Sequence, residues 1–195
     1  MPEFTEHWWR NNQFIFEELG RISFSKDKPP IQALEIGSYE GMSTVWFLDN
    51  WLTHPASSIV CIDTWQGGRE HVGIDFSQVE GRFDENIKPY GSKANKLKAQ
   101  SSVALQYLAY HNYRADFIYV DGSHEAANVL QDLVLAFHIL KPQGLMVCDD
   151  YVWAPPTGDK LDCPKLAIDA FTTCYSKYLQ IIHDIPNRVM AWTKK

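Results

Sequence analysis

Short apolar runs alternate along this chain with longer segments in which apolar residues recur at helical spacing. Apolar runs bounded by Gly, Asp or Ser are typical of strands buried on both faces, whereas the longer periodic pattern is typical of helices. The sequence predicts strands over 32–37, 59–63, 97–100, 116–120 and 144–150, and helices over 38–52, 101–108, 124–140 and 164–177. This alternation predicts an α/β domain with a doubly wound, mostly parallel sheet and right-handed crossovers.

Three regions lie outside this alternation. Residues 1–25 predict an additional helix, and 179–185 with 188–193 predict an antiparallel hairpin at the edge of the sheet. Residues 66–92, rich in glycine and charge, predict either a lid or a solvated surface insertion. We expect one domain over 1–195, in which the aromatic N-terminal segment forms a lid or a homodimer contact.

Composition narrows the possible partners. A net charge of -6 argues against a broad surface for nucleic acid. The four cysteines lack C-x-x-C spacing, which indicates reduced thiols, and the chain has no apolar run of the ~18 residues that a membrane span needs. We expect a soluble cytoplasmic protein that binds neither nucleic acid nor membrane.

A glycine turn, in the sequence ALEIGSYEG, follows the first expected strand. A dinucleotide-binding turn needs a second glycine two positions after Gly37, where this chain has Tyr39. Tyr39 therefore disfavours a pyrophosphate ligand, and the turn suits a nucleoside without phosphates. With CIDTW at the end of the second strand, this turn resembles the cofactor motifs of class I S-adenosylmethionine-dependent methyltransferases.

That resemblance implies the Rossmann-like methyltransferase fold, a seven-stranded, mostly parallel sheet with an antiparallel C-terminal edge hairpin. It implies that Asp63 accepts hydrogen bonds from the ribose hydroxyls and that Gln100 and Ser101 contact the adenine; Ser101 is also expected to cap the following helix. The expected cofactor-binding residues are Glu35, Gly37, Ser38, Gly41, Asp63, Thr64, Trp65, Gln100, Ser101, Asp121 and His124.

Three carboxylates close two of the expected strands. Asp121 ends the fourth strand, and Asp149 and Asp150 end the fifth. Neighbouring parallel strands lie ~4.8 Å apart, so side chains at their carboxyl ends converge. Because clustered carboxylates repel unless protons or a cation intervene, we expect Mg²⁺ or another divalent ion held by Asp121, Asp149 and Asp150. If the strand continues through both Asp149 and Asp150, only one of them reaches the ion.

The pair YVDGSH and VCDDY resembles small-molecule O-methyltransferases, among them catechol-type and sugar or natural-product enzymes. The resemblance implies that the metal binds the hydroxyl oxygen of the substrate. His124 stands where catechol-type members carry a catalytic lysine, and an unperturbed pKa of ~6.5 suits a general base. His124 and Asp121 are the expected catalytic residues, while a helix-capping role is the alternative for Asp121.

Three functions are open at this point. The first is a metal-assisted O-methyltransferase that acts on a small-molecule hydroxyl, and the second is a metal-independent methyltransferase with His124 as the base. The third is a protein of another class, either a non-catalytic cofactor-binding protein or a nucleotide-dependent oxidoreductase. The residues name neither the acceptor nor the methylated atom.

Overall fold

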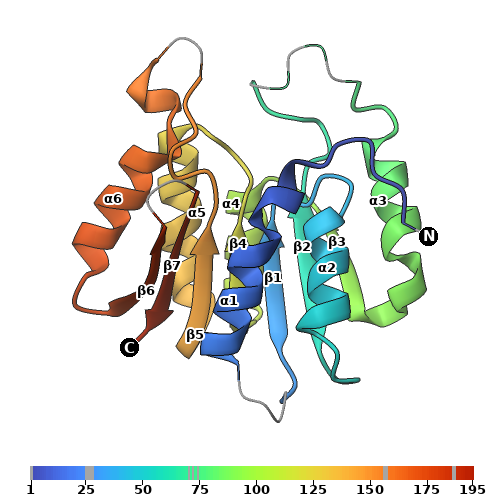
Figure 1. Cartoon of the computed structure of the whole chain (residues 1–195), viewed down its shortest axis with the longest axis horizontal. Coiled ribbons are helices and arrows are strands. Elements are labelled where there is room, and N and C mark those ends of the chain that lie inside the picture. Colours follow the sequence, from blue (N-terminus) through green and yellow to red (C-terminus); the bar gives the residue numbers. More distant parts are fainter. Residues whose placement is uncertain are drawn as a thin grey trace.

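The computed structural model describes residues 2–24, 29–69, 71, 73, 75–155, 158–185 and 188–195. Its centre is a seven-stranded sheet in the order β3-β2-β1-β4-β5-β7-β6 (Figure 1). The strands are β1 (Gln32–Ile36), β2 (Ser58–Asp63), β3 (Ala94–Lys98), β4 (Ala115–Val120), β5 (Leu140–Cys148), β6 (Leu179–Ile185) and β7 (Val189–Lys194). Strands β1 to β5 are parallel, and β7 pairs antiparallel with β5 and β6. The expected fold and its C-terminal hairpin are confirmed.

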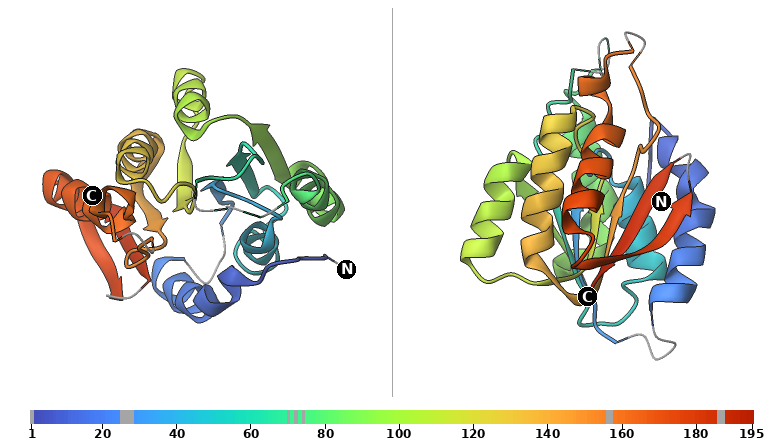
Figure 2. Two further views of the ribbon diagram at one scale, coloured as in Figure 1. Left: turned by 90° about the horizontal axis from the view of Figure 1, so that it is seen from above. Right: turned by 90° about the vertical axis from the view of Figure 1, so that its left-hand side faces the viewer.

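Helices cover both faces of the sheet, as the view from above in Figure 2 shows. One layer contains α1 (Gln13–Ser23), α2 (Met42–Asn50) and α3 (Val79–Ile87), and the other contains α4 (Ser101–Tyr110), α5 (Ala126–Ile139) and α6 (Pro164–Tyr175). Along β4, Phe117 and Tyr119 pack with the first layer, and Ile118 and Val120 pack with the second. Both faces of the central strands are therefore buried, as their continuous apolar runs predict.

Some expected boundaries are wrong. The helix expected from residue 38 begins at Met42, because the preceding residues form the glycine turn, in which Gly37 and Gly41 both have a φ of 84°. β3 starts earlier than expected, and β5 begins at Leu140, directly after α5, with a register shift against β4 in place of the expected break. Ser101 is not the N-cap of α4; Gln100 occupies that position and makes no side-chain capping bond.

The N-terminal extension and the insertion form defined elements. The extension contains a short 3-10 helix, η1 (Trp8–Asn12), followed by α1, and the insertion contains a loop, α3 and a second 3-10 helix, η2 (Lys88–Lys93). Of the predicted regions, Met1, Ser25, Glu70, Val72 and Ile74 lie outside the described residues. The N-terminal extension and the insertion both pack on the face of the sheet that carries α2. The extension contributes Trp9 and Phe16 to the core on that face.

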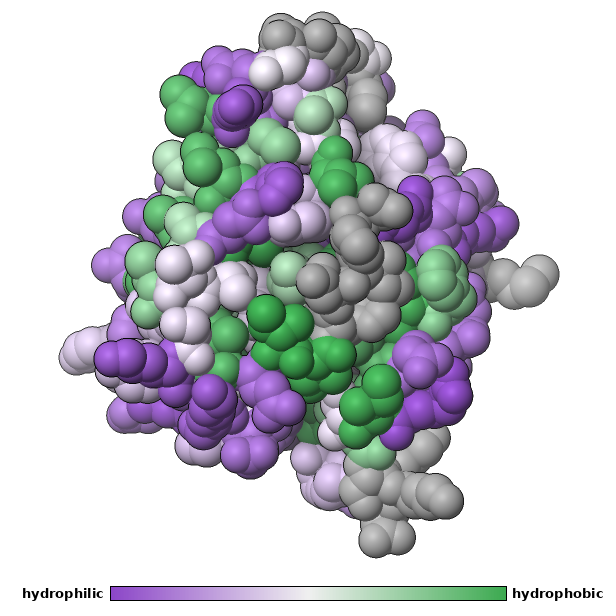
Figure 3. All heavy atoms as spheres, turned by 60° about the vertical axis from the view of Figure 1, so that its left-hand side comes forward, coloured by the Kyte–Doolittle hydropathy of each residue, from purple (hydrophilic) through white to green (hydrophobic). Residues whose placement is uncertain are grey.

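The sheet ends at β6, on the side of the molecule seen in Figure 3. Hydrophobic patches lie between hydrophilic ones on this face, and the exposed apolar side chains of its elements include Leu166 on α6 and Ile181 on β6. The homodimer stays a prediction.

None of the helices in the described ranges has the length and apolar character that crossing a bilayer requires.

Candidate active site

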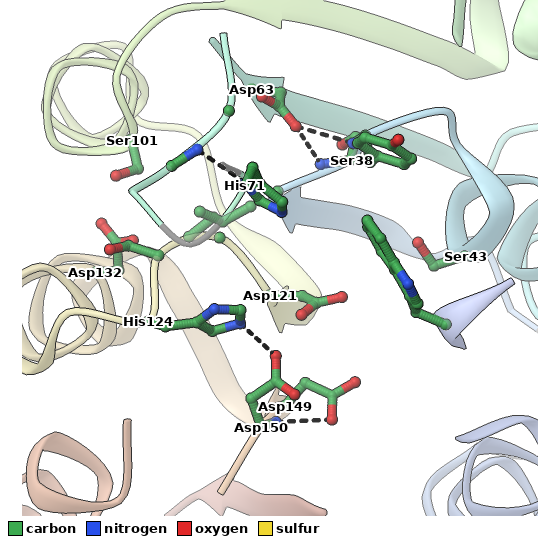
Figure 4. A pocket seen from close by; sticks show the side chains of 18 of the residues that line it. Ser38, Ser43, Asp63, His71, Ser101, Asp121, His124, Asp132, Asp149 and Asp150 are labelled. Atoms are coloured by element: carbon green, nitrogen blue, oxygen red, sulfur yellow. Dashed lines mark hydrogen bonds and ion pairs between the residues drawn. The ribbon is translucent and has the colours of Figure 1, made fainter. Parts of the chain in front are cut away.

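A cavity of about 1220 Å³ opens at the carboxyl ends of the parallel strands (Figure 4). This is where ligands bind in open α/β sheets. One part of its wall is formed by the glycine turn and Asp63, and another by the three carboxylates at the ends of β4 and β5. The expected cofactor residues that line it are Gly37, Ser38, Asp63, Thr64, Gln100, Ser101, Asp121 and His124.

The glycine turn is fixed by the neighbouring strand ends. The N–H of Gly37 donates to the carbonyl of Ile62 at 2.8 Å, and the N–H of Asp121 donates to the carbonyl of Ile36 at 2.8 Å. A Cβ atom on Gly37 would lie 2.0 Å from the carbonyl oxygen of Asp121. Only glycine fits this position, because both the left-handed φ and the close backbone approach exclude a side chain.

The carboxylate of Asp63 holds the turn in place. One oxygen, Oδ2, accepts the backbone N–H groups of Ser38 and Tyr39, both at 2.9 Å, and the other, Oδ1, accepts the N–H of Trp65 at 2.7 Å. Since a carboxylate has about four acceptor positions, Asp63 retains room for roughly one more donor. The hydrogen bonds that we expect from the ribose hydroxyls to Asp63 stay a prediction.

Three expected cofactor residues do not line the cavity. Glu35 is fully buried and accepts hydrogen bonds from Ser43 and Thr44 on α2, and its pKa is raised because burial disfavours the charged form. Gly41 packs against Phe83, and the buried indole of Trp65 donates to the carbonyl of Tyr39. These three residues support the glycine turn and do not face the cavity.

Asp121 and Asp149 are brought together at the floor of the cavity. The hydroxyl of Tyr119 lies 2.9 Å from Oδ2 of Asp121 and 2.5 Å from Oδ2 of Asp149. Desolvation and then the charges of Asp149 and Asp150 raise the pKa of Asp121 well above its ordinary value. Desolvation, followed by the charge of Asp150, raises the pKa of Asp149 to about 6. The floor therefore concentrates negative charge that the surrounding residues only partly compensate.

Asp150 and His124 form a second pair beside this floor. Strand β5 ends at Cys148, so Asp149 and Asp150 follow it in the loop, and both line the cavity. Nε2 of His124 lies 2.7 Å from Oδ2 of Asp150, as the dashed line in Figure 4 shows, and the imidazole stacks on Trp153 with ring centroids 4.1 Å apart. The side chain of His124 is thus oriented by a carboxylate and by an aromatic ring.

The three expected metal ligands have the right kind of donor atom for a divalent cation, but their side chains are not arranged around a common point where it could bind. Their oxygen donors are of the hard type that Mg²⁺ prefers, and the raised pKa values of Asp121 and Asp149 reflect like charges in one place. Within the described ranges, however, no group of three or more His, Cys, Asp or Glu side chains is arranged to hold a metal ion.

Several residues of the cavity were missed by the sequence analysis. The side-chain amide of Asn12, at the end of η1, donates to Asp149 and accepts a hydrogen bond from Arg188. Trp8 lies over Tyr39, with ring centroids 5.1 Å apart. Nothing in the local sequence predicts these contacts. Tyr119 does not line the cavity but bonds to Asp121 and Asp149; it carried a usable signal, because it precedes Asp121 by two residues and alternate side chains point to the same side of an extended chain.

A family model for methyltransferase domains matches residues 34–151. The chain is also similar to an O-methyltransferase from Bacillus cereus solved with S-adenosylhomocysteine (SAH), at 15% identity and a TM-score of 0.68, over 99% of this chain and 84% of that one. It is similar to the mycinamycin methyltransferase MycE, solved with Mg, SAH and mycinamycin VI, at 20% identity and a TM-score of 0.57, over 98% of this chain and 50% of that one.

A third similar structure is a ribosomal protein methylase from Lactobacillus delbrueckii subsp. bulgaricus, at 14% identity and a TM-score of 0.57, over 98% of this chain and 81% of that one. No curated protein sequence matches the chain. Because the acceptors named for these structures differ in class, the structural similarity identifies the fold and leaves the acceptor open.

Proposed function

This chain belongs to the methyltransferase-domain family and is an S-adenosylmethionine-dependent methyltransferase, and from this premise we propose that it methylates a hydroxyl group of a small molecule. The observation that carries the proposal is a single cavity lined by both the glycine turn with Asp63 and the group His124, Asp121, Asp149 and Asp150. Family membership does not support the nucleotide-dependent oxidoreductase, which the side chain of Tyr39 in the turn also opposes.

The cofactor would lie with its ribose beside Asp63 and its adenine beside Gln100 and Ser101. Both regions line the same cavity, and Asp63 retains about one free acceptor position for a ribose hydroxyl. The backbone of Gly37 approaches that of Asp121 closely, so a cofactor bound along the glycine turn would have its sulfonium methyl group near the end of β4.

The acceptor hydroxyl would bind near His124 and Asp121. As the oxygen forms its bond to the methyl carbon, the bond from that carbon to sulfur breaks, and SAH is the leaving group. The hydroxyl proton would pass to the pair that His124 forms with Asp150, whose Nε2 and Oδ2 atoms lie 2.7 Å apart. A base placed in this way raises the nucleophilicity of an otherwise weak hydroxyl.

A divalent cation such as Mg²⁺ would be held by Asp121, Asp149 and Asp150, where it would lower the pKa of the acceptor hydroxyl. The support is the chemistry of these three donors and the raised pKa values of Asp121 and Asp149. Such a cation would also offset the repulsion between the carboxylates.

A metal-independent mechanism is the second candidate, and one observation favours it. Asp150 already contacts His124, so these two residues form a carboxylate–imidazole pair that resembles the base and its orienting group in other enzymes. In this mechanism Asp121 and Asp149 orient the acceptor by hydrogen bonding.

The test is methyl transfer from S-adenosylmethionine to a panel of catechols, sugars and other polyhydroxylated compounds, with and without a chelator. Methylation that stops on chelation and returns with Mg²⁺ supports the first mechanism, and unchanged turnover supports the second. With Asp121→Asn, the first mechanism requires loss of Mg²⁺ binding while SAH affinity is retained. If the protein binds SAH but methylates only proteins or RNA, the small-molecule proposal is wrong.

A further inference from the structure

Helix α5 carries a buried carboxylate at the wall of the cavity, and none of the roles above uses it. Asp132 is only 2% exposed, yet it lines the cavity. Its Oδ1 atom has no hydrogen-bond partner in the part of the chain that the structure describes. A buried polar atom without a partner is costly and uncommon, so its position next to a ligand cavity calls for an explanation.

The surroundings of Asp132 identify which part of the cavity it serves. Desolvation raises the pKa of Asp132 to about 6, and the nearby side chain of Ser101, the first residue of α4, offsets this shift only in part. Figure 4 shows Asp132 and Ser101 on the same side of the pocket, away from Ser38 and Ser43. Asp132 therefore belongs to the wall that Gln100 and Ser101 form.

We propose that Asp132 is a specificity residue for the cofactor base, whose carboxylate accepts a hydrogen bond from the 6-amino group of adenine. This inference rests on the cofactor placement given under the proposed function. The 6-amino group carries the only N–H donors of an adenine joined to ribose, and a buried carboxylate accepts such donors well. Asp63 is not a candidate for this role, because its oxygens already accept three backbone N–H groups and the proposed function assigns its remaining acceptor position to a ribose hydroxyl.

The same geometry explains why a small residue stands at the start of α4. Ser101 and Asp132 both line the cavity, and the short side chain of Ser101 occupies little of the space in which a flat ring would bind. Among the described residues, the Oδ1 atom of Asp132 has no hydrogen-bond partner and remains for a ligand. A donor at this position converts an unsatisfied acceptor into a paired one, which favours ligands with an amino group over those without it.

The experiment compares two probes, SAH and its analogue in which the 6-amino group is replaced by hydrogen, by titration calorimetry. We expect the wild-type protein to bind SAH about tenfold more tightly than the analogue, because the analogue leaves Asp132 unpaired. Asp132→Ala should bind both probes with nearly equal affinity. Asp132→Asn should restore the preference for SAH, because its amide oxygen still accepts a hydrogen bond.

Two controls separate this role from a loss of structure or of charge. Asp169→Asn removes the same charge from α6, where Asp169 pairs with Lys165 on an exposed surface, and should leave the preference unchanged. Thermal melts show whether Asp132→Ala is folded; if it is not, Asp132→Leu takes its place.

The possible outcomes are distinct. Equal binding of SAH and the analogue by the wild-type protein overturns the role of Asp132 without any variant, and so does a preference that Asp132→Ala retains. Failure of the wild-type protein to bind SAH at all would instead overturn the cofactor placement on which the inference rests.

Discussion

The side-chain amide of Asn12 donates a hydrogen bond to the carboxylate of Asp149, although the two residues lie 137 positions apart in the sequence. Asn12 is itself buried and accepts a hydrogen bond from Arg188, just before β7. A residue of the N-terminal extension therefore completes a site that is otherwise built at the ends of β4 and β5. The extension is part of the proposed active site rather than an added surface element.

The first prediction tests this link. Asn12→Ala removes one donor from a buried carboxylate, a loss that costs roughly 1.5–3 kcal/mol when the partner is charged. If Asp149 takes part in turnover, we expect kcat to fall about tenfold or more, with little change in the dissociation constant for SAH. Steady-state kinetics and calorimetry measure the two quantities.

Gln13→Ala is the matched control, because among the described residues the side chain of the neighbouring Gln13 bonds only to Glu17, along α1. It should leave kcat unchanged. Equal losses in both variants would mean that the effect comes from the stability of the N-terminal helix and not from Asp149.

A second prediction concerns the close approach of the glycine turn to β4. Gly37→Ala places a methyl group 2.0 Å from the carbonyl oxygen of Asp121, at a φ of 84°. We expect a loss of ~3 kcal/mol or more in the free energy of unfolding, together with loss of SAH binding, because both overpacking and backbone strain apply. Urea unfolding measures the first effect and calorimetry the second.

Gly81→Ala is the control for that change. Gly81 lies inside α3, where an added Cβ meets nothing within 4 Å. Alanine is the better helix former, so we expect stabilisation by ~0.5–1 kcal/mol. A Gly37→Ala protein as stable as this control would contradict the packing described for the turn.

A third prediction concerns Trp8, which lines the cavity together with Tyr39 and His71. The ring of Trp8 lies 5.1 Å from that of Tyr39 and 6.0 Å from that of His71, centroid to centroid, so it joins the N-terminal extension to the glycine turn and to the insertion. Aromatic pairs contribute roughly 0.5–1.5 kcal/mol beyond burial. If these aromatic pairs hold the cofactor part of the cavity in its binding shape, their loss in Trp8→Ala should weaken SAH binding by about threefold to tenfold.

Phe14→Ala is the comparison for Trp8→Ala, since Phe14 is 62% exposed and does not line the cavity. Its SAH affinity should equal that of the wild type. If Trp8→Ala also binds SAH normally, the extension does not cover the cofactor, and a role at the acceptor end or in a dimer becomes the better hypothesis.

The order of strands and helices along the chain could be predicted because burial on both faces gives the central strands β1 and β4 continuous apolar runs. Asp63 and Asp121 could be placed in a cavity for a related reason, since a carboxylate directly after such a run must lie at a strand end. The start of α2 could not be predicted. The residues from Ser38 to Gly41 continue the helical pattern of the sequence, but the positive φ angles of Tyr39 and Gly41 make them a turn.

The contacts that complete the site depend on tertiary structure. Asn12 reaches Asp149 only because η1 packs beside the end of β5. The sequence around Asn12 contains no pattern from which this packing could be predicted. Asp132 left a signal that was not used. It lies three residues after Val129 and next to Leu133, both buried, so a carboxylate occupies the buried face of a helix. A charged residue in such a position usually has a partner or a function.

The last prediction uses the protonation of Asp132. An unfolded Asp titrates near 3.8, and burial raises the pKa of Asp132 to about 6. The folded protein therefore holds this proton more tightly than the unfolded chain, so the resulting stabilisation is complete below pH ~4 and is lost as the pH rises through about 6. Between these limits, the free energy of unfolding of the wild type should fall by up to ~3 kcal/mol relative to that of Asp132→Asn.

Urea unfolding of both proteins across this pH range measures the difference, in which the titration of the other carboxylates cancels. Parallel stability curves would mean that Asp132 has an ordinary pKa and is accessible to water. Hydrogen bonding from adenine should favour the ionised carboxylate, so SAH affinity in the wild type should rise as the pH increases through 6, and it should do so less in Asp132→Asn. A pH-independent difference in affinity between the two proteins would argue that adenine does not contact this carboxylate.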